Sequence, residues 1–552
     1  MSVRSVLSAA VLGCWLAFGT ADAAAPSLED RGAVHWVAQE IEIHNALSTL
    51  SDHATRGRIV FQDVSLVDVV HARTLPHQSV VVDAGKIVWT GDAAHAPMSK
   101  DTFIIDGKGL FLSPGLVDMH LHTQSLGEQL LRLANGQTSV RDMDGFAWML
   151  RLRRAVQAGA LLAPTAYIAG TIIADQPLFG YAVVVRNETE ARQQVNAQAA
   201  CGYDFVKVHN SLALPLFDAV TDQARRLHKD VVGHIPHDIS IDHVVHAGGM
   251  RTLEHLKGFI SDRDSSLSSE DYAAALKGAQ VWLTPTFYAF NLYKQQDQQK
   301  ELTRPEMRFV ALAKRQRWAE DAARAPDWRE TLNASLPGAL RWMFRNPRAR
   351  LDESTTAAMA RLLRLHPRWL AGTDSAQYDY QIPGIALLDE LALMERRGIA
   401  RADVLRAATS EPAAAMRVEG DFGQIKPGMR ADLVLLAGDP LKNLSVFRAN
   451  RGVMVRGQWL DRTALDEALK SLARIEAEPD AKFKLDAAAA DSLAAQTLAL
   501  SRHDIALDPM MLLPAAAVLK SAGYTTAAKQ LRAADTDTLP GPCFETVPND
   551  GG

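Results

Sequence analysis

Short apolar runs typical of β-strands alternate with helical stretches through the middle of this chain, from about Pro114 to Met416. Eight such runs can be counted, and this alternation predicts a (β/α)8 barrel. In a barrel of parallel strands, only the C-terminal strand ends converge on one open mouth. Six side chains able to bind a metal stand at the ends of these runs: His120, His122, Lys207, His234, His255 and Asp374. We therefore expect all six to face one site.

His120 and His122 are separated by one residue, at the end of a run that begins Pro114-Gly115. Side chains two apart in a strand share a face, so both imidazoles can bind one ion. The chain has 17 histidines, so a bare His-x-His pair can arise by chance in an ordinary strand. The setting favours a metal pair, because a buried strand has no packing reason to carry two imidazoles.

Lys207 is the least expected of the six residues. A charged, unpaired lysine at the inner end of a barrel strand is costly, and burial beside cations favours the neutral amine. A neutral amine can react with carbon dioxide to form a carbamate, which bridges two metals as a carboxylate does. The alternative is an ion pair with a neighbouring acid, and the residues alone favour that alternative.

His234 and His255 each follow a strand-like run. Singly, either is best interpreted as a hydrogen-bonded core histidine. Together, on consecutive strands, they fit a pair of ligands for a second metal. Asp374 can bind a metal and also act as general base, then as acid to the leaving group.

Three further residues are candidate substrate contacts. Arg141 follows the second strand and either binds a substrate carboxylate or forms a structural ion pair with Asp142 or Asp144. His209 can face the same pocket. Tyr288 follows the seventh strand and either contacts substrate or packs beneath the long connection that comes after it.

The segments that flank the barrel predict further units. Residues 57–113 and 417–462 carry β-like runs and turn residues, which predicts one composite β-sandwich with the barrel, residues 114–416, inserted in it. Residues 24–56 are mixed in character and predicted to be an N-terminal linker. Residues 463–552 predict a helical extension that either packs on the barrel or mediates assembly into a homo-oligomer.

One connection within the barrel, residues 285–367, is unusually long and helical in character, with Trp318, Trp328 and Trp342. Long insertions at the C-terminal face of a barrel commonly cover the site. A lid and a solvated helical decoration are equally good predictions here.

The N-terminus has the pattern of a secretory signal peptide, residues 1–23, with Arg4, an apolar run from Val6 to Phe18 and a small-residue cleavage site at Ala21–Ala23. The chain is therefore expected to be exported, to the periplasm or the medium. Lipid attachment at Cys14 is the second alternative, since the apolar run continues past it.

Bulk composition limits the partners. A net charge of −5 and a pI near 6.4 give no electrostatic case for nucleic acid, and no later apolar run is long enough to span a bilayer. The remaining cysteines, Cys201 and Cys543, either form a disulfide, which an export compartment permits, or stay as two buried thiols.

Three stretches resemble the amidohydrolase superfamily: Pro114–His122, Leu370–Asp374 and Gly423–Leu435. Three more are similar to its imidazolonepropionase and Xaa-Pro-dipeptidase-like branch: Asp204–Val208, Val232–Ile235 and Arg251–His255. The resemblance covers residues 58 to 460 and is specific, because independent motifs occur in the same order.

The resemblance implies a binuclear site with two divalent metal ions, most plausibly Zn²⁺. His120, His122 and Asp374 would hold one metal and His234 and His255 the other. An N6-carboxylated Lys207 would bridge them together with a hydroxide. Imidazolonepropionases lack this lysine, so Lys207 indicates the dipeptidase-like side.

The implied activity is hydrolysis of a C–N bond in a small amide, such as a dipeptide or an N-acyl amino acid. A second hypothesis keeps the site but changes the bond, to a cyclic amide, lactone or phosphoester. A third, a scaffold without catalysis, would require lost ligands, and all six positions are filled.

Overall fold

The computed structural model describes the chain in segments separated by short gaps. The described residues are 28–177, 182–256, 276, 278–291, 295–323, 359–376 and 379–535. The predicted signal peptide, Cys14, Cys543, Trp328 and Trp342 lie outside these residues.

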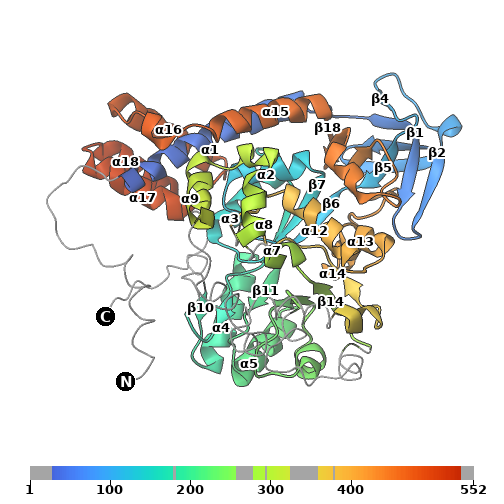
Figure 1. The fold of residues 1–552 in the computed structure, drawn as a ribbon, viewed down its shortest axis with the longest axis horizontal. Coiled ribbons are helices and arrows are strands. Elements are labelled where there is room, and N and C mark those ends of the chain that lie inside the picture. Colours follow the sequence, from blue (N-terminus) through green and yellow to red (C-terminus); the bar gives the residue numbers. More distant parts are fainter. Residues whose placement is uncertain are drawn as a thin grey trace, which may run out of the picture.

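Eight short strands pair in parallel to form the barrel. They lie at the centre of the molecule (Figure 1). They are β6 (Leu116–Leu121), β7 (Gln137–Asp142), β8 (Thr165–Ile168), β11 (Phe205–Val208), β12 (Asp230–Gly233), β13 (Thr252–Glu254), β14 (Trp282–Thr284) and β15 (Arg368–Trp369). Their pairings make a three-stranded sheet, β6-β7-β8, and a seven-stranded sheet that runs from β11 to β15 and carries β9 (Ile173–Ala174) and β10 (Val183–Val184) at its edge.

Single parallel bridges join the two sheets. Ala169 pairs with Phe205, and Leu121 pairs with Ser375, so the order of neighbours returns from β15 to β6. The last strand was expected at residues 370–373, but the regular strand ends at Trp369. The segment beyond it stays in register, since Met119 N–H donates to Ala371 O and Asp374 N–H donates to His120 O. The pattern of a (β/α)8 barrel is therefore confirmed, with a last strand that is irregular.

Helices follow the strands and cover the barrel. They are α2 (Leu126–Ala134), α3 (Ala147–Gln157), α4 (Glu188–Cys201), α5 (Leu214–Arg226), α12 (Ile385–Arg396), α13 (Arg401–Ala407) and α14 (Ser410–Ala415). Gly372 shows how tightly the last strand approaches the first. A Cβ at this position would lie 2.8 Å from His120 Cβ and 2.6 Å from Thr284 Cγ2, so only glycine fits.

Both flanks of the barrel contribute strands to one eight-stranded sheet, at the place where a composite β-sandwich was predicted. Its N-terminal strands are β1 (Ile59–Asp68), β2 (Arg73–Asp83), β3 (Lys86–Asp92), β4 (Phe103–Asp106) and β5 (Phe111–Pro114). Its C-terminal strands are β16 (Leu433–Leu436), β17 (Gly452–Val455) and β18 (Gln458–Asp461). β16 pairs antiparallel with β5, and Phe61, Leu112 and Trp459 share a separate apolar core.

The prediction of an N-terminal linker at residues 24–56 is wrong for most of that segment. Leu28–His53 form the 26-residue helix α1, which lies along α15 (Arg462–Ile475) and contacts α16 (Ala487–Arg502) and α17 (Pro509–Ser521) (Figure 1). Val34, Val37 and Leu47 of α1 are fully buried. The helix is therefore part of the core.

The helical tail packs on the rest of the chain, as one of its two predicted roles requires. α17 and α18 (Thr525–Asp535) join α16 and α1 in one cluster. Arg151 of α3 donates hydrogen bonds to Ser501 O and to Ala534 O, which ties the tail to a barrel helix. Assembly through this tail stays a prediction.

Leu47→Ala tests whether α1 stabilises the fold. We expect the free energy of unfolding to fall by about 2–5 kcal/mol, because a fully buried leucine is truncated. Its exposed neighbour Ser48 provides the control, and Ser48→Ala should change stability by no more than about 0.5 kcal/mol. Chemical denaturation of both variants is the measurement. Equal stabilities would show that α1 contributes nothing to the core.

The described part of the long connection is helical, with α7 (Phe287–Asn291), α8 (Gln295–Leu302) and α9 (Leu312–Ala323). Trp318 of α9 is 1 % exposed; its indole N–H donates to Asp379, and its backbone oxygen accepts from the Tyr380 hydroxyl. α9 therefore packs on the segment that follows Asp374, and at Trp318 the prediction of a solvated decoration is wrong.

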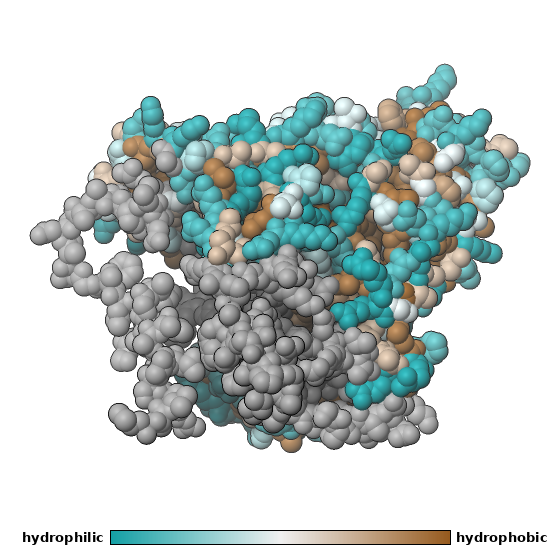
Figure 2. All heavy atoms as spheres, viewed as in Figure 1, coloured by the Kyte–Doolittle hydropathy of each residue, from teal (hydrophilic) through white to brown (hydrophobic). Residues whose placement is uncertain are grey.

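No helix among the described residues is both long and apolar enough to cross a membrane. On the face drawn in Figure 2, hydrophilic side chains predominate over the described elements, and hydrophobic ones are scattered among them.

Candidate metal centre

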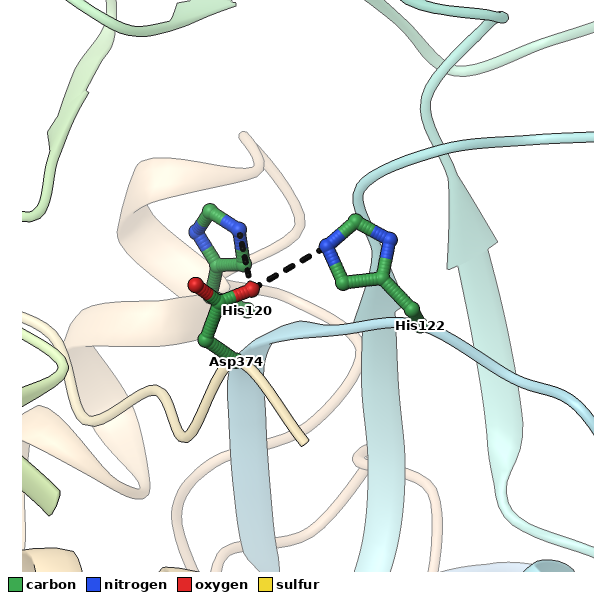
Figure 3. Close-up of side chains that lie close together, drawn as sticks. All are labelled: His120, His122 and Asp374. Carbon is green, nitrogen blue, oxygen red and sulfur yellow. Dashed lines mark hydrogen bonds and ion pairs between the residues drawn. The ribbon is translucent and has the colours of Figure 1, made fainter. Parts of the chain in front are cut away.

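His120, His122 and Asp374 converge at the mouth of the barrel (Figure 3). Asp374 Oδ1 lies 3.4 Å from His120 Nε2 and 3.1 Å from His122 Nε2. One ligand atom from each residue lies within 4.8 Å of the others, a group that can hold a metal ion. All three side chains are largely buried. The structure thus brings together the three residues predicted for the first metal.

The backbone around Asp374 is held by a buried acid that the sequence analysis did not single out. Asp118 accepts hydrogen bonds from the backbone N–H groups of His120 (3.2 Å) and Thr373 (3.1 Å) and from the Thr373 hydroxyl (2.8 Å). Asp374 itself adopts φ 55°, an uncommon value for a residue other than glycine. Such values persist where the surrounding structure holds them, and Asp118 supplies that support.

The histidines of the predicted second metal lie beside the first group. The rings of His120 and His255 are 4.5 Å apart between centroids, and those of His255 and His234 are 4.7 Å apart. His255 Nδ1 lies 2.7 Å from the Thr286 hydroxyl and 3.6 Å from Asp374 Oδ2. The candidate ligands of the two metals therefore form one continuous cluster of side chains.

Lys207 is buried, 1 % exposed, at the third position of β11. Gly233 on the adjacent strand leaves room for it, since a Cβ there would lie 3.0 Å from Lys207 Cδ. Among the described residues, Lys207 has no ion pair within 4.0 Å, so the ion-pair alternative finds no partner in that part of the chain.

Burial determines the charge states of the basic groups. It lowers the pKa of Lys207 to about 8, so a minor neutral fraction exists near neutral pH. Burial and the nearby Lys207 lower the pKa of His120 to about 4, which keeps this imidazole neutral. Burial acts in the same direction on His122, but the hydrogen bond to Asp374 outweighs it and raises the pKa of His122 above its ordinary value.

Asp374 is ionised, as a carboxylate that binds a metal must be. Burial opposes ionisation of Asp374, but the imidazoles of His120, His255 and His122 hold the pKa of its carboxyl well below the usual range. Neutral imidazole nitrogens and an ionised carboxylate are a donor set suited to zinc and similar divalent ions. The residues present thus fit a metal.

The three candidate substrate contacts have different environments. Arg141 forms a structural ion pair, but with Glu254 rather than with Asp142 or Asp144, and it is 1 % exposed. Its three nitrogens donate within the protein, so it does not present a group to substrate. His209 lies beside His234, with ring centroids 4.4 Å apart, and stays a candidate.

Tyr288 packs beneath the long connection, as the second of its two predictions requires. It is 7 % exposed, and its hydroxyl donates to Glu301 at 2.8 Å. Contact with substrate is therefore not the role that the structure gives to this hydroxyl.

Glu254 is the principal site residue that the sequence analysis missed. It is fully buried, and its carboxylate lies between His120 Nδ1 (2.8 Å) and Arg141 (2.8 Å). The available signal was an acid in a buried strand directly before the candidate ligand His255. Burial opposes its ionisation, but Arg141 and His120 hold the pKa of Glu254 well below the usual range.

Glu390 supports the site from α12. Its carboxylate accepts the backbone N–H groups of Phe287 (3.0 Å) and Tyr288 (2.7 Å), directly after Thr286, the partner of His255. Burial raises the pKa of Glu390 from 4.5 to about 8. The folded protein thus keeps a proton that the unfolded chain releases at lower pH.

This proton linkage predicts that Glu390 makes the fold less stable as pH rises from about 4.5 to about 8. Glu390→Gln keeps an acceptor for only one of the two N–H groups, so it should be less stable at every pH. Because it cannot ionise, its stability should depend less on pH over this range. Denaturation midpoints of both proteins at pH 5 and pH 8 (roughly the ends of the window) are the measurement. An identical pH dependence in the two proteins would contradict the raised pKa.

Known proteins are similar to this chain in sequence and in structure. The model of the amidohydrolase family matches residues 111–460. Adenine deaminase of Clostridium botulinum (strain ATCC 19397 / Type A) is 29 % identical over 84 residues, which is 15 % of this chain and 14 % of that protein. The chain thus matches only about a seventh of the length of these curated relatives.

Two solved structures share the fold over most of the chain. Bottromycin amidohydrolase is 24 % identical with a TM-score of 0.62, over 80 % of this chain and 95 % of that one. A putative prolidase from Bifidobacterium longum is 18 % identical with a TM-score of 0.58, over 75 % and 99 %. Because the family match at residues 111–460 covers more than half of the 552 residues, the chain belongs to the amidohydrolase family.

Proposed function

We propose that the chain hydrolyses the amide bond of a small substrate, such as a dipeptide or an N-acyl amino acid, at the barrel mouth. The observation that carries the proposal is the convergence of His120, His122 and Asp374 beside a buried Lys207 with a lowered pKa. The structural likeness to prolidase-like proteins supports this choice among C–N bonds.

We also propose that the site holds two divalent ions, with zinc favoured by the donor set. His120, His122 and Asp374 would bind one ion, and His234 and His255 the other. The neutral fraction of Lys207 would take up carbon dioxide, and the resulting carbamate would bridge the two. The proximity of the His120, His255 and His234 rings supports a shared site.

The chain's own residues supply the proton transfers. Bound divalent ions polarise a carbonyl and make water a better nucleophile at neutral pH. Asp374, which stays ionised, accepts the proton of the attacking water and returns it to the departing nitrogen as the C–N bond breaks. The buried surroundings limit access of bulk water to these steps.

Amine release across a panel of dipeptides and N-acyl amino acids tests the proposed substrate class. We expect the zinc-loaded protein to hydrolyse one of the two classes, with Asp374 required. No turnover on any member by protein that holds metal would reject the amide proposal. Lactones, cyclic amides and phosphoesters would then be tested at the same site.

Export is proposed on two grounds. The first 23 residues have the pattern of a signal peptide, and Cys201 at the end of α4 is disulfide-bonded, as an oxidising compartment allows. Fractionation of expressing cells, with mass spectrometry of the mature N-terminus, tests the proposal. Recovery of the uncleaved chain in the cytosol alone would reject it.

A further inference from the structure

The side chains around His120 form a closed network that spans three strands of the barrel. Glu254 on β13 lies 2.8 Å from His120 Nδ1 through Oε2, while its Oε1 accepts from Arg141 (2.8 Å) and from the Thr252 hydroxyl (2.5 Å). Arg141 on β7 also donates to Thr252 Oγ1 (2.8 Å) and to Met119 O on β6 (2.7 Å). All four of these side chains are buried, so water does not compete with the network.

The network determines which nitrogen of His120 is available. An ionised carboxylate only accepts hydrogen bonds, so the contact with Glu254 places the imidazole proton on Nδ1. Nε2 then carries the lone pair, and Nε2 is the atom that lies 3.4 Å from Asp374 Oδ1. The ring is thus held in the tautomer and orientation that a metal beside Asp374 requires.

Arg141 offsets the desolvation cost of the buried Glu254 carboxylate. A lone ionised carboxylate in the barrel interior would carry a large desolvation cost, and a guanidinium with a fixed fork geometry offsets it. Removing either charge would leave the other one buried without its counterion, which is strongly unfavourable. Glu254 and Arg141 are therefore expected to act as a unit.

We propose that Glu254, held by Arg141, is a positioning residue that sets the tautomer of His120 and thereby the affinity of the His120–His122–Asp374 group for its metal. This inference rests on the metal site of the proposed function. It also explains why Arg141, which the sequence suggested for substrate, is enclosed by protein groups. Glu254 ends β13 and His255 follows it directly, so one short segment serves both candidate metal positions.

Glu254→Gln is the first test. The amide keeps the shape of the side chain, but it cannot accept from His120 and from Arg141 at once, because one end of the amide is a donor. We expect an affinity for Co²⁺ or Zn²⁺ at the first site about 10–100-fold lower in chelator competition. In ¹⁵N-histidine NMR spectra of the full chain, the signal of the His120 Nδ1–H tautomer should be lost or exchange.

The matched control is Glu40→Gln. Glu40 is also buried, 2 % exposed, and accepts the backbone N–H of Leu126, which is outside the network of Glu254, Arg141 and His120. This variant should bind metal as the unmodified chain does.

If Glu254→Gln fails to fold, the double variant Glu254→Gln with Arg141→Gln takes its place in the test, because it removes both buried charges together. The double variant should show the same loss of about 10–100-fold in metal affinity relative to the unmodified chain, since Arg141 acts through Glu254.

Unchanged metal affinity and an unchanged His120 signal in a folded Glu254 variant would overturn the inference. So would an equal loss of affinity in Glu40→Gln, which would indicate a general effect of removing a buried acid. Failure of the proposed substrate class is a separate result, since protein that binds metal but hydrolyses no amide still reports the effect of Glu254. An unmodified chain that takes up no divalent metal would overturn both proposals.

Discussion

Asp374→Asn is expected to abolish nearly all amide hydrolysis, with a loss in kcat of about 10³-fold or more. The substitution removes the carboxylate that lies 3.1 Å from His122 and 3.4 Å from His120 and 3.6 Å from His255. It removes a candidate metal ligand and the proposed proton acceptor together, while the amide keeps the size of the side chain. Steady-state kinetics at saturating zinc, together with bound zinc per chain, are the measurements.

Asp379→Asn is the matched control for this experiment. Asp379 lies five residues further along, and its carboxylate accepts the Trp318 indole N–H outside the metal group. We expect it to keep the hydrolytic rate within a few-fold of the unmodified chain. A similar kcat for Asp374→Asn and the unmodified chain would remove Asp374 from the chemistry.

Lys207→Ala is the substitution with the second largest expected effect. If a carbamate of Lys207 bridges two ions, the variant should lose one of them and more than about 100-fold in kcat, because several kcal/mol of transition-state stabilisation depend on the metals. The unmodified protein should also lose activity when reconstituted with metal in buffer depleted of carbon dioxide, and regain it when bicarbonate is added.

Lys229→Ala separates this chemistry from a general effect of removing a lysine. Lys229 precedes β12 at the opposite end of the barrel, where its amine donates to Tyr203 O. The Lys229→Ala variant should keep both its metal content and its hydrolytic rate. Two bound ions and a normal rate in Lys207→Ala would exclude the carbamate bridge and leave Lys207 as a buried amine.

The elements with the clearest local pattern were predictable from the sequence. Short apolar runs there carry polar residues that have no packing role. The structure places His120 on β6 and Lys207 on β11, and His122 directly after β6. The union of both flanks in one sheet was also predictable, because the same β-pattern occurs on either side of the barrel.

Helix α1 was missed for a physical reason. Its buried residues, such as Val34, Ile43 and Leu47, face several neighbours, since α2, α15, α16 and α17 all contact the helix. A helix covered on several sides has no single apolar stripe, so its periodicity is weak. Tertiary contacts with a tail more than four hundred residues away stabilise it, and a local pattern does not report such contacts.

The role of Arg141 depended on a partner that sequence order does not reveal. Asp142 and Asp144 are its neighbours along the chain, but the carboxylate it binds belongs to Glu254, which reaches it from β13 across the interior. The strand periodicity indicates that Arg141 points inward. It does not indicate which of the inward-facing acids on the other strands lies within hydrogen-bonding distance.

The most direct test of the account is a metal titration of chelator-treated protein, with bound zinc per chain and amine release measured on the same samples. We predict no turnover without metal, and turnover that rises with zinc until two ions are bound per chain. Full amide hydrolysis by protein shown to hold no metal would contradict the proposal that His120, His122 and Asp374 form a catalytic metal centre.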